Sequence, residues 1–196
     1  WMFRNRGVRY IGSSTSFFLK EERYLSDWLQ VKKDLIKKDV FRQNFHYEIM
    51  INPHPHSDKN HTCLVTTRNP YTLLGNETLE DQRRNVLVEL LSKLSNSGNP
   101  AGLFNLLKSQ SDEIIDLILK SLVDKAYINK SHKVFHIGEA NYIPSYSAEI
   151  AFDMTDNYYI FCIDQMFEMI EKNRKEQKLY HSAPIALRFV RAADAF

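Results

Sequence analysis

Two neighbouring runs of strand-forming residues constrain the fold of this chain most strongly. In residues 45–52 the large apolar residues Phe45, Tyr47, Ile49 and Ile51 occupy every second position, a period typical of a β-strand with one buried face. Residues 62–68 form a second β-rich run, and a polar segment with two prolines separates it from the first. We therefore expect a β-hairpin with a long tip.

The rest of the chain mixes helical and strand patterns without a regular alternation. We expect helices over residues 20–38, 76–96, 103–107, 111–122 and 157–176. We expect further strands over residues 133–137, 147–154 and 185–191. This order lacks the repeated βαβ unit of a doubly wound fold, so it predicts an α+β domain. An antiparallel or mixed sheet with helices packed on one face fits it best, as a single domain over residues 1–196.

Composition and charge exclude several classes of protein. The 196 residues are 43% hydrophobic and 26% charged, as in an ordinary globular protein. The 26 basic and 24 acidic side chains nearly cancel, so we expect no nucleic-acid partner. No apolar stretch reaches the length of a membrane span. Cys63 and Cys162 lie in apolar runs, which favours two buried thiols and a cytoplasmic location.

The sequence has no self-sufficient nucleotide or metal signature. It contains no glycine-rich dinucleotide loop, no Walker A loop and no paired-cysteine motif. His54, His56 and His61 are candidate metal ligands because imidazole binds zinc or copper. The prolines beside them favour an extended turn that points the rings apart. We therefore expect a solvated hairpin tip there and predict no metal site.

Three charged residues inside predicted strands are the candidate catalytic groups. Glu48 and Glu149 either lie on a solvated face or, if that face is covered, are desolvated carboxyl groups of raised pKa that act as a base. Arg188 lies in a mostly apolar run and needs a partner if it is buried. It is either an edge arginine or a fixed cation that stabilises a developing oxyanion.

The C-terminal residues resemble the vanillyl-alcohol-oxidase-type flavoproteins. Residues 184–189, Pro-Ile-Ala-Leu-Arg-Phe, occupy the place of a P-V-E-x-R-[FW] strand in the sugar-lactone oxidases of that superfamily. Residues 47–53 and 63–69 look more like the FAD-linked relatives of type II cholesterol oxidase. Arg188 matches the family arginine near flavin and substrate, whereas Ala186 stands where the lactone oxidases have an acid.

This resemblance implies a substrate-binding, or cap, domain whose sheet covers the flavin ring. FAD would be bound by a separate domain of the same parent protein, which makes this chain a fragment. The implied reaction is oxidation of an alcohol carbon in a sterol-like or sugar-lactone-like small molecule, with hydride passing to FAD. The cap would supply pocket shape, a charge partner and exclusion of water.

Two other functions remain open at this point. The chain has no complete catalytic constellation, and its alternation predicts an exposed sheet face, so it is alternatively a non-enzymatic α+β interaction module. A domain that binds a small molecule without flavin is the third possibility. Substrate identity, the electron acceptor and the attachment of FAD do not follow from the residues.

Overall fold

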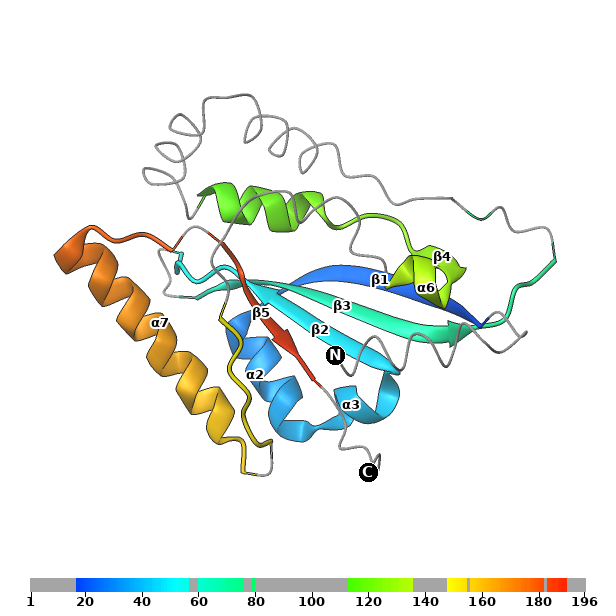
Figure 1. Ribbon diagram of the computed structural model, residues 1–196, viewed down its shortest axis with the longest axis horizontal. Coiled ribbons are helices and arrows are strands. Elements are labelled where there is room, and N and C mark those ends of the chain that lie inside the picture. The colour runs from blue at the N-terminus through cyan, green and yellow to red at the C-terminus, as the bar shows by residue number, and fades with distance from the viewer. Residues whose placement is uncertain are drawn as a thin grey trace.

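One antiparallel sheet organises the chain (Figure 1). The computed structural model describes residues 17–56, 60–75, 79, 113–135, 148–154, 156–181 and 183–189. Within them, the strands are β1 (Phe18–Asp27), β2 (His46–Ile51), β3 (Thr62–Tyr71), β4 (Tyr127–Lys130) and β5 (Ile185–Arg188). They pair in the order β4-β1-β3-β2-β5, and every pairing is antiparallel. With its helices, the sheet confirms the predicted α+β class.

The predicted hairpin forms the centre of the sheet. β2 and β3 pair antiparallel, with Tyr47 opposite Thr67 and Ile51 opposite Cys63. β1 and β5 pair with the outer sides of this hairpin. Because side chains alternate along a strand, Tyr47, Ile49 and Ile51 share one face and are at most 3% exposed. Burial of this face explains the period-two pattern from Tyr47 to Ile51. The prediction was wrong for Phe45, which precedes β2 and is 55% exposed.

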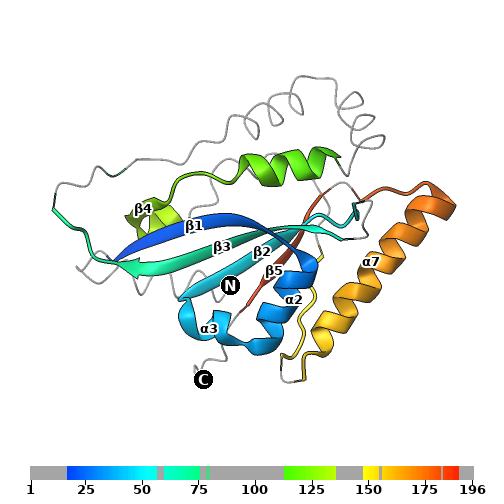
Figure 2. The same cartoon turned by 180° about the vertical axis from the view of Figure 1, so that it is seen from behind.

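Three helices cover that apolar face: α2 (Trp28–Lys37), α3 (Asp39–Gln43) and α7 (Tyr158–Gln177) (Figures 1 and 2). α2 begins where β1 ends, and the Asp27 side chain accepts a 2.9 Å hydrogen bond from the Gln30 backbone N–H. The Trp28 ring packs edge-on against Phe167 of α7 at 5.7 Å. The buried residues of this core are Trp28, Val31, Leu35, Tyr47, Ile49, Ile51, Cys63, Val65, Tyr159, Ile160, Ile163 and Phe167.

The opposite face of the sheet carries a helix as well. A helix covers residues 113–121, and Figures 1 and 2 place it across the sheet from α2 and α7. Its fully buried Ile115 and Leu119 pack against Leu64 of β3. A short helix, α6 (Ser131–Val134), follows β4 and buries Val134 with Leu19 of β1. Helices therefore lie on both faces, although the sequence pattern indicated only one.

The predicted helix over residues 20–38 was wrong in its first half. Residues up to Asp27 belong to β1, which pairs with ten consecutive residues of β3. Long-range pairing outweighs the local helix preference of this lysine- and glutamate-rich stretch. The true helix buries Trp28, Val31 and Leu35 and leaves Leu29 and Ile36 more than half exposed.

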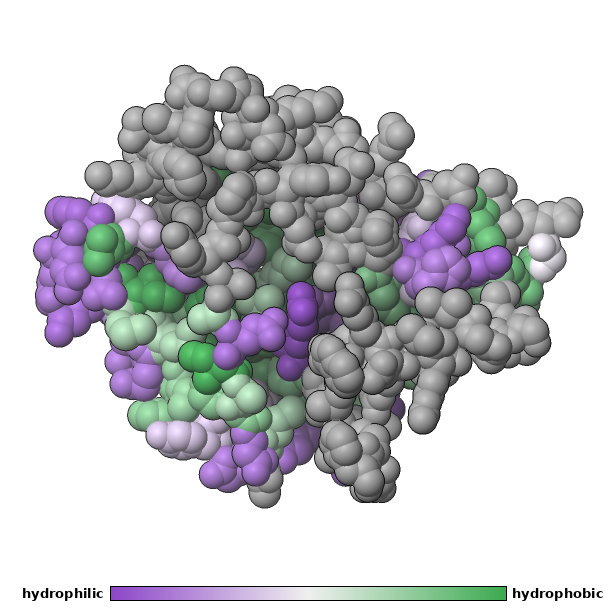
Figure 3. Space-filling model, viewed as in Figure 1, coloured by the Kyte–Doolittle hydropathy of each residue, from purple (hydrophilic) through white to green (hydrophobic). Residues whose placement is uncertain are grey.

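Two predicted strands are not strands in the described residues. Residues 133 and 134 lie in α6, and β4 precedes them. Residues 148–154 have no regular secondary structure, and Ile150 and Phe152 are exposed there. Figure 3 shows hydrophobic surface where this segment and β5 lie in the view of Figure 1. The helices predicted over residues 76–96 and 103–107 fall outside the described residues, apart from residue 79.

The predicted α7 and β5 are confirmed, with α7 at Tyr158–Gln177 and β5 at Ile185–Arg188. Both cysteines are free thiols; Cys63 is fully buried and Cys162 is half-buried on α7. Burial raises the pKa of the Cys63 thiol, which keeps it protonated and unreactive. Among the described helices, none is both long enough and apolar enough to cross a membrane.

Candidate functional site

A row of five charged side chains crosses the sheet on the face opposite α2 and α7. Its members come from four adjacent strands: Arg23 and Glu21 from β1, Arg68 from β3, Glu48 from β2 and Arg188 from β5. The strand register explains why these side chains lie side by side, since Glu21 lies opposite Arg68 and Glu48 lies opposite Arg188. We call this set the charge row.

Cations and anions alternate along the charge row. Arg23 Nη2 lies 3.0 Å from Glu21 Oε1, and Arg68 Nε lies 2.6 Å from Glu21 Oε2. Arg68 Nη1 then reaches Glu48 Oε2 at 3.0 Å, and Arg188 Nε lies 3.4 Å from Glu48 Oε1. Each of the four carboxylate oxygens thus faces one guanidinium.

The interior of the charge row is buried. Glu21 is 1% exposed, and Glu48 and Arg68 are each 8% exposed. Burying a charge is costly unless it is paired and hydrogen-bonded, and the alternating contacts meet that condition. Arg68 is the central member because it bonds both acids with different nitrogens. Its planar fork can make these two contacts at once, which an ammonium group would do less well.

His46 and Phe135 complete the surroundings of Arg68. Arg68 Nη1 lies 2.9 Å from His46 Nδ1, so this guanidinium donates to a neutral imidazole. The Phe135 ring lies over the guanidinium carbon at 5.2 Å and meets the His46 ring edge-on at 5.1 Å. Burial, reinforced by the charge of Arg68, lowers the pKa of His46 to about 4. His46 is therefore uncharged at neutral pH.

Glu48 is held as an ionised carboxylate. Burial alone would raise its pKa, but the hydrogen bond and charge of Arg68, with the charge of Arg188, outweigh burial and lower it. This direction is opposite to the raised pKa expected for a buried base. Glu48 is thus suited to fix the position of Arg188, whereas a carboxylate of lowered pKa is a weak proton acceptor.

Of the three predicted catalytic residues, the structure brings Glu48 and Arg188 together and leaves Glu149 apart. The Arg188 side chain is 50% exposed, so its charged group is accessible from outside the sheet. Glu149 lies in the exposed segment of residues 148–154 and not in a strand. That segment contacts the other side of the sheet, where Lys38 Nζ donates to the Met154 carbonyl at 3.1 Å. The alternation argument for Glu149 therefore fails, and its catalytic role stays a prediction.

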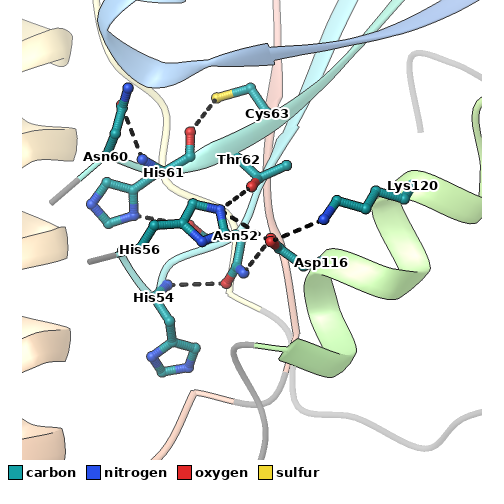
Figure 4. A network of polar contacts seen from close by, with 9 residues as sticks. All are labelled: Asn52, His54, His56, Asn60, His61, Thr62, Cys63, Asp116 and Lys120. Atoms are coloured by element: carbon teal, nitrogen blue, oxygen red, sulfur yellow. Dashed lines mark hydrogen bonds and ion pairs between the residues drawn. The ribbon is translucent and has the colours of Figure 1, made fainter. Parts of the chain in front are cut away.

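A second polar cluster lies at the tip of the β2–β3 hairpin (Figure 4). Asn52 Nδ2 donates to Asp116 Oδ1 at 2.7 Å, and His56 Nε2 lies 3.0 Å from Asp116 Oδ2. The Asn52 side-chain oxygen accepts from the His54 backbone N–H at 3.0 Å. Because Asp116 belongs to the helix of residues 113–121, this cluster fastens that helix to the hairpin tip.

The predicted solvated hairpin tip was wrong for two of its three histidines. His54 is 1% exposed and bonds the His181 carbonyl oxygen at 2.7 Å. His61 is 8% exposed, bonds the Asn52 carbonyl oxygen and stacks on Phe167 at 4.0 Å. Their rings therefore serve packing, and only His56 is exposed. In the part of the chain that the structure describes, no group of three or more His, Cys, Asp or Glu residues could hold a metal ion.

Sequence reasoning missed Arg68 and Glu21. The signal used for Arg188, an arginine inside a strand-forming run, also applied to Arg68 at the end of the run 62–68. Glu21 carried no such signal, because its surroundings were assigned to a helix. Its place opposite Arg68 follows only from the pairing of β1 with β3.

Comparison with known proteins identifies no relative. No protein family matches the sequence, no curated protein is similar to it, and no solved structure resembles the fold.

Proposed function

We propose that the charge-row face of the sheet is the substrate-facing side of a substrate-binding domain in an FAD-dependent oxidoreductase. The proposed parent protein oxidises an alcohol carbon of a sterol-like or sugar-lactone-like substrate. One observation carries the proposal: Glu48 and Arg188, chosen separately from the sequence, form an ion pair on one sheet face with Arg188 half exposed. The resemblance of residues 184–189 to a flavoprotein strand is its second support.

The described residues do not themselves fit FAD. A pyrophosphate is usually bound by a glycine-rich turn at a helix N-terminus, where backbone N–H groups converge. Gly75 is the one glycine among the described residues, and it lies after β3 with no helix described beside it. In this proposal FAD is therefore held by a separate domain, where it serves as hydride acceptor.

In this proposal, the chain binds and orients the substrate. The guanidinium of Arg188 contacts the substrate oxygen and stabilises negative charge that develops on it. Glu48 acts as a positioning residue, because its Oε1 holds Arg188 Nε while its Oε2 is held by Arg68. The charges of Arg68 and Arg188 keep Glu48 ionised.

The test uses the protein purified as its gene encodes it. We expect a flavin absorbance band, and we expect sterols or sugar lactones added without oxygen to bleach it. A protein without flavin, unresponsive to the whole substrate panel, would leave the interaction module as the better assignment.

A matched pair of variants tests the role of Arg188 directly. Arg188→Lys keeps the charge but loses the planar fork, so turnover should fall at least tenfold while the melting temperature changes little. Arg42→Lys, an exposed arginine of α3 on the other face, should change neither. Proportionate losses of turnover and stability in Arg188→Lys would instead indicate a structural arginine.

A further inference from the structure

The two outer strands of the sheet differ in how well they are covered. In the part of the chain that the structure describes, β4 and β5 each pair with one neighbouring strand. Tyr127 and Asn129 of β4 are at most 6% exposed. Ile185 and Leu187 of β5 pack against the apolar core but are only half-buried. The outer side of β5 is therefore a place where a further strand can add to the sheet.

Residues 148–154 have the sequence pattern of such a strand. Every second residue of this segment is apolar, the period of a strand with one buried face. Residues 148–153 are nevertheless exposed, with Ile150 at 66% and Phe152 at 40%. Met154 is half-buried and packs against the apolar core. Apolar side chains exposed together in this way mark a surface that contacts another molecule.

The segment matches the outer side of β5 in side-chain chemistry. On β5, Leu187 packs against the apolar core and Arg188 lies on the opposite face, in the charge row. An added strand with Phe152 on the apolar face has Glu149 and Asp153 on the face of Arg188, because side chains alternate. Opposite charges on neighbouring strands favour this pairing.

The segment forms no strand with the β5 of its own chain. Within one chain the two run in the same direction (Figures 1 and 2), whereas every strand pairing of this sheet is antiparallel. The end of the segment is held in place, because Lys38 Nζ donates to the Met154 carbonyl and α7 begins at Tyr158. A second copy related by a twofold axis can present the segment in the opposite direction.

We infer that two copies of this chain associate, each adding residues 148–154 as an antiparallel strand to the β5 of the other. The chain carries both halves of the contact, an open strand edge and a strand-forming segment. The contact therefore occurs twice and closes a symmetric dimer. Ile150 and Phe152 extend the apolar core of the second copy beside β5. This inference is independent of the proposed function, because it concerns the sheet edge and involves no substrate.

Sedimentation equilibrium on the purified protein measures the association. We expect a dimer that dissociates on dilution. Phe152→Asp should weaken the dimer at least tenfold, because it places a charge in an apolar contact. Ile36→Asp, at a 54% exposed position of α2, is the matched control and should leave the dimer unchanged. A wild-type protein that stays monomeric up to about 100 µM would overturn the inference. A dimer that Phe152→Asp does not weaken would overturn it as well.

Hydrogen exchange identifies the segment that pairs. The amides of residues 149–153 should be protected in the dimer and exchange freely in Phe152→Asp. Circular dichroism checks that the variant is folded; if it is not, the neutral variant Phe152→Thr decides by the same two measurements. Protection of these amides in a monomer would assign the pairing to a single chain and refute the second copy. Free exchange in a dimer would assign the dimer to another surface and refute the inference too.

Discussion

The same strands form two faces of the sheet that differ in their interactions: one is packed with apolar side chains, and the other carries buried ion pairs. On β2, Ile49 points into an apolar core under α2 and α7 and is fully buried, while its neighbour Glu48 points into the charge row and is 8% exposed. Apolar packing is non-directional and tolerates substitutions of similar volume. Buried charges require every partner to be in place. The apolar face therefore stabilises the fold, and the charged face has the specific geometry that a binding site needs.

Removing the central cation of the charge row should have the largest effect on stability. Arg68→Met keeps most of the volume but leaves Glu21 and Glu48 buried without their shared partner. Breaking a buried ion pair in this way costs about 3–5 kcal/mol. Urea unfolding measures the loss. The combined variant Glu21→Gln, Arg68→Met, Glu48→Gln should recover much of it, and no recovery would mean that packing by Arg68 matters more than charge.

Truncating the apolar face should cost somewhat less. Ile49→Ala removes buried methyl groups next to α2 and α7, and such changes cost about 2–5 kcal/mol. Ile49→Val should cost only about 0.5–1.5 kcal/mol, because the site keeps most of its contacts. Urea unfolding measures both variants. A smaller loss of unfolding free energy in Ile49→Val than in Ile49→Ala supports packing as the source of stability on this face. In the charge row, by contrast, Arg68→Lys should lower the free energy of unfolding strongly although it changes the side-chain volume little, because an ammonium group replaces the planar fork.

The charged face should be sensitive to acid through His46. Its pKa falls from the ordinary 6.5 to about 4 in the folded protein, so the unfolded chain binds the proton first. Its contribution to stability is complete above pH 6.5 and is lost as the pH falls toward 4. Because the His46 ring is only partly buried, solvent screening limits the change to about 1–2 kcal/mol.

Unfolding by urea at several pH values measures this slope for His46. His46→Gln should flatten the slope between pH 6.5 and 4, whereas His132→Gln, at an exposed position of α6, should leave it unchanged. An unaltered slope in His46→Gln would assign the acid sensitivity to the carboxylates of the row.

The smallest effect on stability should come from the exposed end of the row. Arg188 is half exposed and 3.4 Å from Glu48, and pairs of this kind contribute about 0–1 kcal/mol. Arg188→Gln should therefore change the free energy of unfolding by no more than about 1 kcal/mol while it lowers turnover at least tenfold. A loss as large as that of Arg68→Met would place Arg188 among the structural members of the row.

The local patterns of residues 45–52 and 62–68 were sufficient to predict β2, β3 and their pairing as a hairpin. Alternation is a property of neighbouring residues, and burial of one face imposes it directly. The apolar periodicity of α7 and the run that forms β5 were sufficient for the same reason. Glu48 and Arg188 were chosen as charges inside strand-forming runs, and the structure pairs them, while their catalytic role stays a prediction.

Tertiary structure decided what depends on partners distant in the sequence. β1 is a strand because β3 and β4 pair with its two edges, against its own helix-forming composition. Glu21 and Arg68 are 47 positions apart and meet only because that pairing places them opposite each other. The pKa of Glu48 depends on Arg68 and Arg188, which are distant in the sequence, so its sequence neighbours could not reveal it. Local propensity thus determined three of the four strands that carry the charge row, β2, β3 and β5, whereas long-range pairing determined β1 and the contacts between the charged side chains.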